Sequence, residues 1–404
     1  MGGVTVDIGF DDAVHRQLAE ARRLGPTAID ARTGGLIVLR YDEIERLAHD
    51  PHAAGLGLAL FDLMGIGDGD LRRWYGGIMF TNDGEPHHRL RRLVARAFTP
   101  RAVALHRQTA ALAAQQAFAE LQASAGGDLV GALAEVPITV MCKLLGVPDD
   151  DVGDFVRYGD DLSPVFGVME PEQIDRAQAA IGGLIADVDR MIGRRADDRS
   201  DDLISSLLDA EDAGDRLTHE EVVAMVGNLI VAGHDTTVSQ IGCTLLTLLR
   251  HPRAVDVVRR HTVALADVVT ETIRFEPSLG TVPRTLVAPT VIGDVLRDVG
   301  TLVLLSTASA NREEDVWGDP DVVRPERFAD ADAPRLLTFG SGAHYCLGAA
   351  LARMTLEEVV IAFAACDGIT PVGDLDEVEW RQVLGRSPSR LDVEIAPVGA
   401  GAHA

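Results

Sequence analysis

The chain has 404 residues, of which 47% are hydrophobic, and a formal net charge of −25 at pH 7. This length and apolar content are enough for a large buried core, whereas the strong negative charge argues against nucleic acid as a general partner. The four cysteines are scattered without a repeated spacing, which excludes a disulfide framework and a clustered zinc site and fits a reducing compartment.

The beginning of the chain shows no targeting signal. Residues 1–25 mix acidic residues with arginines and hold no sustained apolar run, so we expect neither a signal peptide nor an anchor there. The longest apolar stretch, Val222–Gly233, lies between Glu221 and His234 and falls short of the roughly 20 residues that a membrane helix needs. We therefore expect a soluble, cytoplasmic protein without a membrane partner.

Hydrophobic periodicity predicts a chain that is mainly α with small β-sheets. No repeat of 20 to 50 residues recurs, and no long Ser/Gly linker divides the chain. Residues 1–404 are therefore interpreted as a single domain. In chain order, the predicted elements are strand Gly35–Arg40, helices Glu85–Ala97, Ala102–Ala123, Pro171–Ala196, Thr218–Leu249 and Leu265–Phe275, strands Thr281–Val287 and Val291–Leu304 (with turns at Gly293 and Gly300), and strand Leu391–Ile395.

The first notable helix contains the sequence EPHHRLRRLVARAF. His87 and Arg91 are four residues apart and share a helix face, which suits them to hold two neighbouring carboxylates. Residues 87–107 contain six arginines and no acid, and Arg89, Arg92 and Arg96 fall on a different face from the first pair. The alternative interpretation is a solvated basic face.

Two further helices carry polar patterns. The sequence AGHDTT, residues 232–237, interrupts a long apolar helix. A threonine in such a place often only bonds back to the carbonyl four residues earlier. Glu271 and Arg274, three residues apart, would by themselves most simply form a surface ion pair worth a few tenths of a kcal/mol.

One cysteine stands apart from the others. Cys346 lies in the glycine-rich stretch LTFGSGAHYCLGAALARMT, where a helix begins. The N–H groups of Leu347 and Gly348 are expected to lower the pKa of its thiol. Gly340 and Gly342 would let the chain bend tightly and approach a flat partner. A single thiolate suits a metal whose other ligands come from a cofactor, haem iron above all; a buried structural cysteine and a catalytic nucleophile are the alternatives.

The stretch FGSGAHYCLGAALAR resembles the haem-binding loop of cytochromes P450. The matching positions are Phe339, Gly340, Gly342, His344, Cys346, Gly348, Leu351, Ala352 and Arg353. Three further motifs of that family occur in the right order, namely EPHHRLRR, AGHDTT, and ETIR with RPERF, so the resemblance extends from about Asp83 to Arg353. It implies a bacterial cytochrome P450 fold, with haem between the long central helix and the helix of the cysteine loop.

The resemblance assigns residues to the cofactor, heme b (iron protoporphyrin IX). Cys346 would be the ligand of the iron. His87, Arg91, Arg284 and His344 would hold the propionates, and Ala232 and Gly233 would leave room above the porphyrin. Glu271, Arg274 and Arg327 would form a buried charge network behind the loop. The other cofactor-binding residues of the loop would be Phe339, Gly340 and Gly348.

The resemblance also implies a reaction, the insertion of one atom of O2 into an apolar small molecule by hydroxylation or epoxidation. Asp235 and Thr236 would deliver protons for cleavage of the O–O bond, and His234 is given no role. The chain lacks a cysteine cluster for an iron–sulfur centre, and GLGLAL at Gly55 lacks the third glycine of a dinucleotide fingerprint. We therefore expect a separate ferredoxin and its NAD(P)H-dependent reductase as electron donors.

By family position, the substrate pocket would be mostly apolar, with Trp74 and Tyr75 as lids. This suits a terpenoid, steroid, fatty acyl or polyketide-like molecule without choosing among them. A non-catalytic haem sensor and a cysteine-dependent hydrolase are the alternative functions, and a monomer is expected. The stretches assigned to the pocket are Phe61–Phe80, Phe155–Val168, Asn228–Thr236, Ser278–Val282 and Leu384–Ser387.

Overall fold

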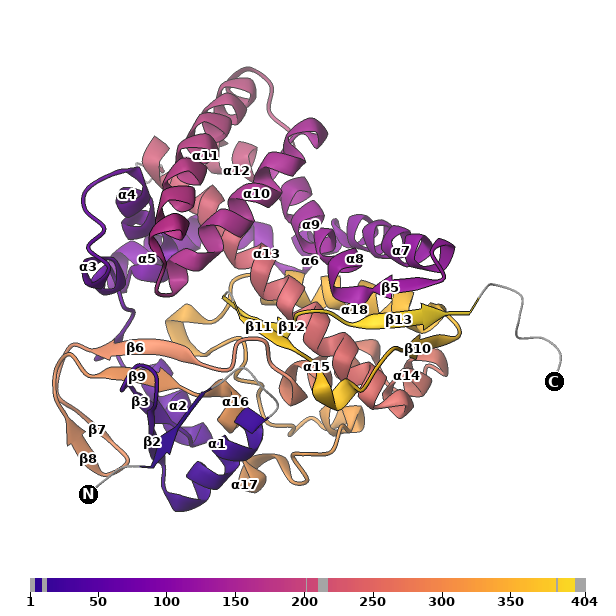
Figure 1. Cartoon of the computed structure of the whole chain (residues 1–404). Helices are drawn as coiled ribbons and strands as arrows, with labels where there is room; N and C mark the ends of the chain where they lie inside the picture. Colours follow the sequence, from indigo (N-terminus) through magenta and orange to yellow (C-terminus); the bar gives the residue numbers. More distant parts are fainter. Residues whose placement is uncertain (1–3, 9–12, 201, 210–216, 383, 397–404) are drawn as a thin grey trace.

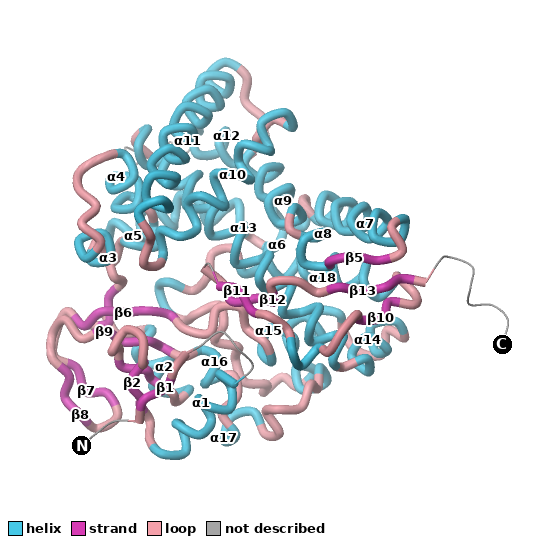
Figure 2. The backbone as a smooth tube through the Cα atoms, viewed as in Figure 1, coloured by secondary structure: helices cyan, strands magenta, loops and turns pink. Residues whose placement is uncertain are grey.

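The computed structural model describes residues 4–8, 13–200, 202–209, 217–382 and 384–396. Helices make up most of this part of the chain, and the strands gather in small sheets at one side and along the centre (Figures 1 and 2). The architecture confirms the prediction of a mainly α chain with small β-sheets.

The helices fall along the whole described chain. Their bounds are α1 Ala13–Leu24, α2 Tyr41–Ala48, α3 Ala59–Leu63, α4 Asp70–Gly77, α5 Gly84–Val94, α6 Pro100–Ala104, α7 Arg107–Ala123, α8 Leu129–Leu133, α9 Glu135–Leu145, α10 Val152–Leu162, α11 Pro171–Asp197, α12 Leu203–Asp209, α13 His219–Arg250, α14 Pro252–Arg259, α15 Leu265–Phe275, α16 Thr307–Ala310, α17 Glu314–Trp317 and α18 Ala349–Ala365. Short 3-10 turns include η2 Ala95–Phe98, η4 Ser163–Phe166 and η6 Gly342–His344.

The largest sheet has the strand order β1-β2-β3-β9-β6-β4 and mixes parallel and antiparallel neighbours. The others are the sheet β10-β13-β5 and the two hairpins β11-β12 and β7-β8. The strands are β1 Thr5–Val6, β2 Thr27–Asp30, β3 Leu36–Val38, β4 Ala53–Ala54, β5 Gly126–Asp128, β6 Val282–Leu286, β7 Thr290–Ile292, β8 Val295–Arg297, β9 Leu302–Leu305, β10 Ile369–Pro371, β11 Trp380–Gln382, β12 Arg386–Pro388 and β13 Asp392–Ile395.

The 32-residue helix α13 runs through the centre of the molecule (Figure 1). It begins with a capping box, in which Thr218 Oγ1 accepts the N–H of Glu221 at 3.2 Å and Glu221 Oε2 accepts the N–H of Thr218 at 2.7 Å. By length and composition α13 alone, among the described helices, could cross a membrane, but 83% of its most apolar window is buried inside the protein. It is therefore the core helix of this fold.

The apolar core consists of two main clusters, and both are built on α13. The larger one surrounds the first half of α13 with α4, α9, α10 and α11, and the second gathers its other half with α7, α15 and α18. Residues 232–237 lie between the two clusters. Helix α18 also contributes to both, through Leu351 and Leu356. The two helices that carry the predicted motifs therefore meet where the core changes from one cluster to the other.

Two predicted helices differ from the observed ones. The predicted helix Ala102–Ala123 is divided into α6 and α7 at residues 105–106, where no proline or glycine marks a break. The break lets Arg107 begin α7 and pair with Glu357 and Glu358 of α18. Helix α5 ends at Val94, and its predicted last turn is the 3-10 turn η2.

Candidate functional site

The cysteine loop runs from a turn at Phe339, through extended backbone at Ser341 and the 3-10 turn η6, to the start of α18. The N–H of Cys346 donates to the Phe339 carbonyl at 2.8 Å, which closes the loop. Gly342 has a φ of +68°, and a Cβ there would lie 2.3 Å from the carbonyl oxygen of Ala48 in α2. The close contact with the backbone of α2 and the positive φ together require glycine at position 342.

The Cys346 thiol is the exposed one among the four free cysteines. The thiol is accessible but densely surrounded by protein atoms, and the resulting desolvation raises its pKa, while the N–H of Gly348 and the charges of Arg91 and Arg353 act in the opposite direction. The expected net lowering of the pKa by the chain's own groups is therefore wrong. Desolvation outweighs the single N–H group and the two guanidinium groups that favour a thiolate.

The rest of the loop is fixed by Arg353 of α18. Its guanidinium lies 4.4 Å from the centre of the Phe339 ring and donates to the Tyr345 hydroxyl at 3.3 Å. Gly348 caps α18 and supplies the N–H near the sulfur. Phe339 and Gly348 are therefore parts of one rigid frame around Cys346, and Gly340, with a φ of +73°, makes the bend before it.

A group of basic side chains converges beside this loop from α5 and β6. The rings of His87 and His344 lie 4.2 Å apart, and Arg91 donates to the Tyr345 carbonyl at 2.7 Å. Burial lowers the pKa of His344, and the charge of the buried Arg284 of β6 lowers it further, which places Arg284 in the same group. The structure thus brings all four predicted anion-binding residues together.

These basic groups lack acidic partners, with one exception. His344 Nε2 lies 2.7 Å from Asp83 Oδ1. Among the described residues, no carboxylate lies within 4.0 Å of Arg91 or Arg284, and the buried Nδ1 of His87 has no hydrogen-bond partner. Burial lowers the pKa of Arg284 and of Arg91, and lowers that of His87 to about 4. Such a cluster is ready to receive an anion.

The middle of helix α13 is buried except for three residues, Ala232, Gly233 and Thr236, which we call the accessible window. Ala232 is exposed, and Gly233 and Thr236 are half-buried. Thr236 Oγ1 donates to the Ala232 carbonyl at 2.6 Å. The missing side chain of Gly233 leaves room for Met141 of α9, whose Cε lies 2.3 Å from the position of a Cβ. For Gly233 the expected room above a porphyrin is thus taken by a neighbouring side chain.

Asp235 points away from this window toward the turn between β11 and β12. Its Oδ2 accepts the backbone N–H groups of Leu384 at 2.9 Å and Gly385 at 3.0 Å. The adjacent His234 lies 3.1 Å from Asp160 of α10. Sequence analysis missed both anchors, because the partners are 149 and 74 residues distant and no periodic pattern marks them.

Behind the loop, Glu271 and Arg274 form the predicted charge network. Arg274 donates to both carboxylate oxygens of Glu271 at 2.7 and 2.9 Å, and Arg327 Nε donates to the same carboxylate at 3.1 Å. Both Glu271 and Arg274 are 0% exposed. The prediction of a buried network is confirmed, and the surface ion pair is excluded.

Trp74 and Tyr75 were expected to act as lids over the substrate pocket. Trp74 and Tyr75 are 4% and 1% exposed, and Tyr75 stacks on Phe61 with ring centres 4.2 Å apart. They belong to the core, so their assignment as lids is wrong.

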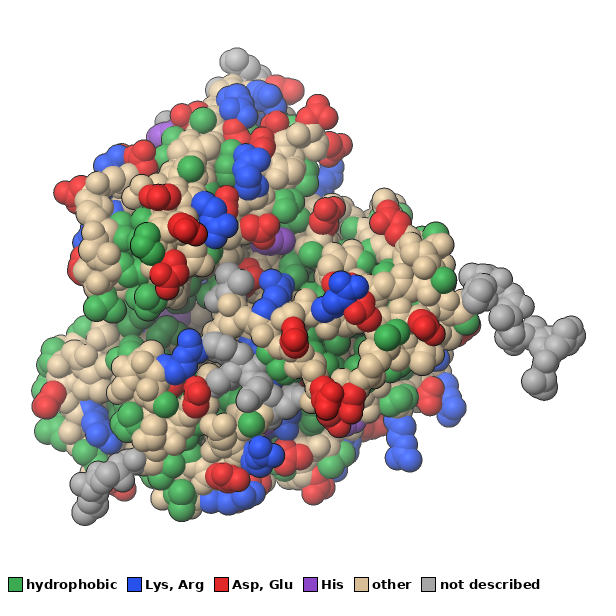
Figure 3. All heavy atoms as spheres, viewed as in Figure 1, with side chains coloured by type: hydrophobic (Ala, Val, Ile, Leu, Met, Phe, Trp, Pro, Cys, Tyr) green, Lys and Arg blue, Asp and Glu red, His purple; other side chains and the backbone are tan. Residues whose placement is uncertain are grey.

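Figure 3 shows the surface hollowed between the upper helices and the lower sheet, with hydrophobic side chains around the hollow.

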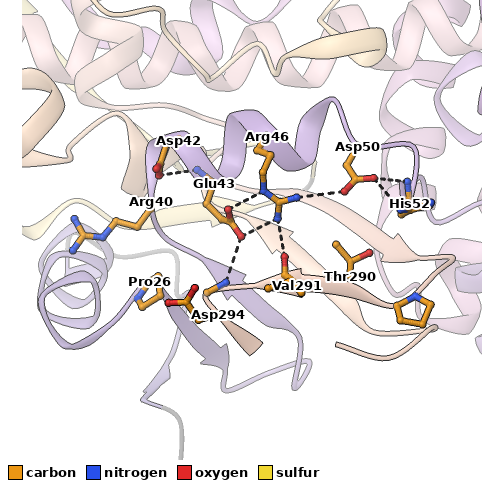
Figure 4. Close-up of a pocket in the computed structure, with 12 residues that line it drawn as sticks. Pro26, Arg40, Asp42, Glu43, Arg46, Asp50, His52, Thr290, Val291 and Asp294 are labelled. Carbon is orange, nitrogen blue, oxygen red and sulfur yellow. Dashed lines mark hydrogen bonds and ion pairs between the residues drawn. The ribbon is translucent and has the colours of Figure 1, made fainter. Parts of the chain in front are cut away.

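A separate groove of about 570 Å³ lies between α2 and the β7-β8 hairpin (Figure 4). Several of its charged side chains are paired with one another: Arg46 contacts Glu43 at 2.9 Å and Asp50 at 3.4 Å, and donates to the Val291 carbonyl at 2.8 Å. None of the predicted site residues lines it. Within the described residues, no three His, Cys, Asp or Glu side chains gather in a way that could hold a metal ion.

Comparisons with known proteins agree on one family. The profile described as Cytochrome P450 matches residues 160–363. The chain is 34% identical to a vitamin D(3) 25-hydroxylase of Pseudonocardia autotrophica, over 80% of this chain and 79% of that protein. It is 31% identical to a 6-deoxyerythronolide B hydroxylase of Saccharopolyspora erythraea, over 94% and 96% of the two chains. The crystal structure of CalO2 superposes with a TM-score of 0.90 at 28% identity, covering 98% of this chain and 100% of the other.

Proposed function

Because the chain belongs to the cytochrome P450 family and is a monooxygenase with haem as its cofactor, we propose that Cys346 supplies the thiolate ligand of the haem iron. The observation that carries this proposal is the accessible thiol of Cys346, held in a rigid loop beside basic groups that lack acidic partners. The N–H of Gly348 and the charges of Arg91 and Arg353 favour the thiolate, and a bound cation would add to that effect.

The residues around Cys346 fit a haem, and heme b is the form we propose. In the described chain, Cys346 does not belong to a group of three or more His, Cys, Asp or Glu side chains that could hold a metal, and a single thiol suits an iron whose remaining ligands come from a porphyrin. Two carboxylates, such as the propionates, would satisfy Arg91, Arg284 and the orphaned Nδ1 of His87. His344 would act through its bond to Asp83 or exchange it for a propionate.

When bound, haem supplies the iron at which O2 is reduced by two electrons, with two protons, so that one oxygen atom enters the substrate and the other leaves as water. The chain's own part is to deliver the protons. Thr236 Oγ1 donates to the Ala232 carbonyl, which turns its lone pairs to the window. Asp235 keeps Oδ2 on the turn at 384–385, so Oδ1 is the atom that would take up and release a proton.

The substrate is proposed to be a largely apolar molecule of the polyketide or steroid type. This rests on the apolar stretches around α13 and on relatives named as hydroxylases of vitamin D(3) and 6-deoxyerythronolide B. Hydroxylation or epoxidation is the proposed outcome. A separate ferredoxin with its NAD(P)H-dependent reductase would supply the electrons to a monomeric, cytoplasmic enzyme.

The test is the absorption spectrum of the purified, reduced protein under carbon monoxide. Wild type and Cys366→Ala, the variant of a buried cysteine, should both show the red-shifted band of a thiolate-bound haem. Cys346→Ala should lack it, and retention of the band would refute the ligand assignment. Thr236→Ala should keep the band and release more peroxide per NAD(P)H consumed. A colourless but active preparation would instead favour the cysteine-dependent hydrolase.

A further inference from the structure

Asn228 is a buried amide without a partner in the middle of α13. It is 5% exposed, and its side chain makes no hydrogen bond with any described residue. Other buried polar side chains farther along α13 are satisfied: Gln240 donates to the Glu276 carbonyl at 3.0 Å, and Thr244 contacts Thr272 at 3.2 Å. The amide atoms of Asn228 are not among the buried polar atoms that are cut off from solvent, so they face an accessible space. Polar groups inside folded proteins are usually hydrogen-bonded to protein or water, and this amide is therefore available to a molecule that enters that space.

The position of Asn228 on the helix points to the substrate side. Ala224, Asn228, Ala232 and Thr236 are spaced by four residues and share one face of α13. At the upper end of this row Ala224 packs under Gly77, 3.3 Å from the position of a Cβ there. At the lower end lies the accessible window of Ala232 and Thr236. Asn228 lies between the packed residue Ala224 and the accessible residue Ala232.

The neighbouring faces of α13 offer no room for a ligand. A Cβ on Gly227 would lie 2.5 Å from the indole nitrogen of Trp74 and 2.7 Å from Leu184. A Cβ on Gly233 would meet Met141. Helices α4, α11 and α9 thus close the faces on either side. The row that holds Asn228 contains two accessible residues of the window, Ala232 and Thr236.

We propose that Asn228 hydrogen-bonds a neutral oxygen group of the substrate and thereby sets which carbon is oxidised. This rests on the proposed function, which puts the reaction beside Ala232 and Thr236. With a rise of about 1.5 Å per residue, Asn228 lies about 6 Å along the helix from Ala232 and about 12 Å from Thr236. The substrate is then an apolar skeleton with a hydroxyl, ketone or lactone oxygen about 6–12 Å from the oxidised carbon. An amide can donate to or accept from any of these groups.

The experiment compares ligands that differ in that oxygen alone. The probes are 5α-androstan-3-one with 5α-androstane, and 1-dodecanol with dodecane, titrated calorimetrically into the haem-loaded protein. Wild type should bind at least one oxygenated probe about tenfold more tightly than its hydrocarbon partner. In Asn228→Leu, which replaces the amide by an apolar side chain of similar size, this preference should disappear while the hydrocarbons bind equally well or better.

The control is Thr244→Val, which removes a buried hydroxyl two turns beyond the window and should keep the wild-type preference. A wild type that prefers neither oxygenated probe, or a leucine variant that keeps the preference, would overturn the role of Asn228. Failure of the haem assignment would be seen separately, as loss of the red-shifted carbon monoxide band, which Asn228→Leu should leave intact. Hydroxylation of the oxygenated probe at more positions in Asn228→Leu than in wild type would further support the proposal.

Discussion

The molecule contains two buried clusters of charge that are built in opposite ways. In the first, Glu271 receives two hydrogen bonds from Arg274 and one from Arg327, all at 3.1 Å or less. In the second, Arg91 and Arg284 have no carboxylate within 4.0 Å among the described residues. Arg284, itself 5% exposed, donates only to the adjacent Pro283 carbonyl at 2.9 Å.

The difference distinguishes a structural element from a binding site. Burying a charge is costly unless it is paired and hydrogen-bonded. The cluster at Glu271 meets that cost inside the chain, so it belongs to the fold and is present with or without a ligand. In the cluster at Arg284, the buried positive charges are not compensated until an anion binds. Part of the binding free energy of that anion therefore comes from neutralising these charges. The following predictions test this contrast.

The largest effect is expected from breaking the satisfied cluster. Glu271→Gln removes the negative charge between two buried arginines and should lower the free energy of unfolding by about 3–5 kcal/mol, because an uncompensated buried charge remains. The measurement is denaturant unfolding of haem-free and haem-loaded protein, and both forms should lose stability. The matched control is Asp154→Asn, which breaks the solvent-exposed pair Asp154–Arg157 of the same spacing and should change the stability far less, because solvent screens this pair. Equal costs for the two variants would contradict a special role for burial.

The unsatisfied cluster should respond with the opposite sign in the haem-free protein. Arg284→Leu removes a buried guanidinium that has no carboxylate partner, so the haem-free chain should be as stable as wild type or more so. Haem affinity should fall about 10- to 100-fold, since a charge-assisted hydrogen bond to a propionate is lost. Transfer of haem to an excess of apomyoglobin measures this affinity. A variant that loses stability without haem and keeps haem affinity would reverse the roles of the two clusters.

Sequence reasoning could predict much of this arrangement, because several of its signals are local. The bounds of α15 agree with the predicted Leu265–Phe275, since an amphipathic period and the following Pro277 fix them. Turns at Gly293 and Gly300 divided the strands correctly, because both residues have positive φ. The contact of Arg327 with Glu271 could be predicted because the family resemblance assigns the RPERF motif to this network, although 56 residues separate the two side chains.

The rest depended on contacts that leave no local signal. Nothing near Leu105 marks the break between α6 and α7, which follows from the docking of Arg107 on α18. The burial of Trp74 follows from Gly227 on another helix. The hydrogen bonds from residues 384–385 to Asp235, and the burial of Asn228, likewise result from packing between segments that are distant in the sequence. Sequence patterns identify which residues can act, whereas their partners appear only in the folded chain.

A third charged cluster contains His15, whose protonation should make the stability of the protein depend on pH. His15 lies 2.9 Å from Glu276, which Arg386 also contacts. Burial and the charge of Arg312 lower the pKa of His15 below its ordinary value of 6.5. The unfolded chain therefore takes up a proton at a higher pH than the folded one, so this contribution to stability is present above pH 6.5 and is lost as the pH falls below it.

Unfolding measured from pH 7 to pH 5 should show this loss, and His15→Gln should make the decline less steep. Glu276 does not interfere in that range, because its pKa is held below the ordinary 4.5 by His15 and Arg386 despite its burial. His219→Gln, at an exposed ion pair with Asp189, should leave the slope as in wild type. An unchanged slope in His15→Gln would show that this histidine does not couple to folding.

The smallest effect concerns the outer face of α5 and η2, where arginines are exposed and their charges are screened. Within the acid-free run, Arg92, Arg96 and Arg101 are exposed, and Arg89, expected on the same face as Arg92 and Arg96, contacts Glu221 of α13. Of the three exposed arginines, Arg92 and Arg96 lie nearest in the sequence to Arg91, which contacts Tyr345 of the cysteine loop.

We expect an acidic ferredoxin to dock at Arg92 and Arg96, where the path to the cysteine loop is short. Arg92→Glu and Arg96→Glu should each lower the rate of reduction by ferredoxin a few-fold at low salt and weaken its dependence on ionic strength, because the Debye length falls from about 10 Å at 0.1 M to about 3 Å at 1 M. Haem content should be unchanged, and Arg157→Glu on α10 serves as a control with equal change of charge. Equal rates and equal salt slopes in wild type and both variants would rule out this face, and would leave Arg91 as the arginine of α5 with a part in the site.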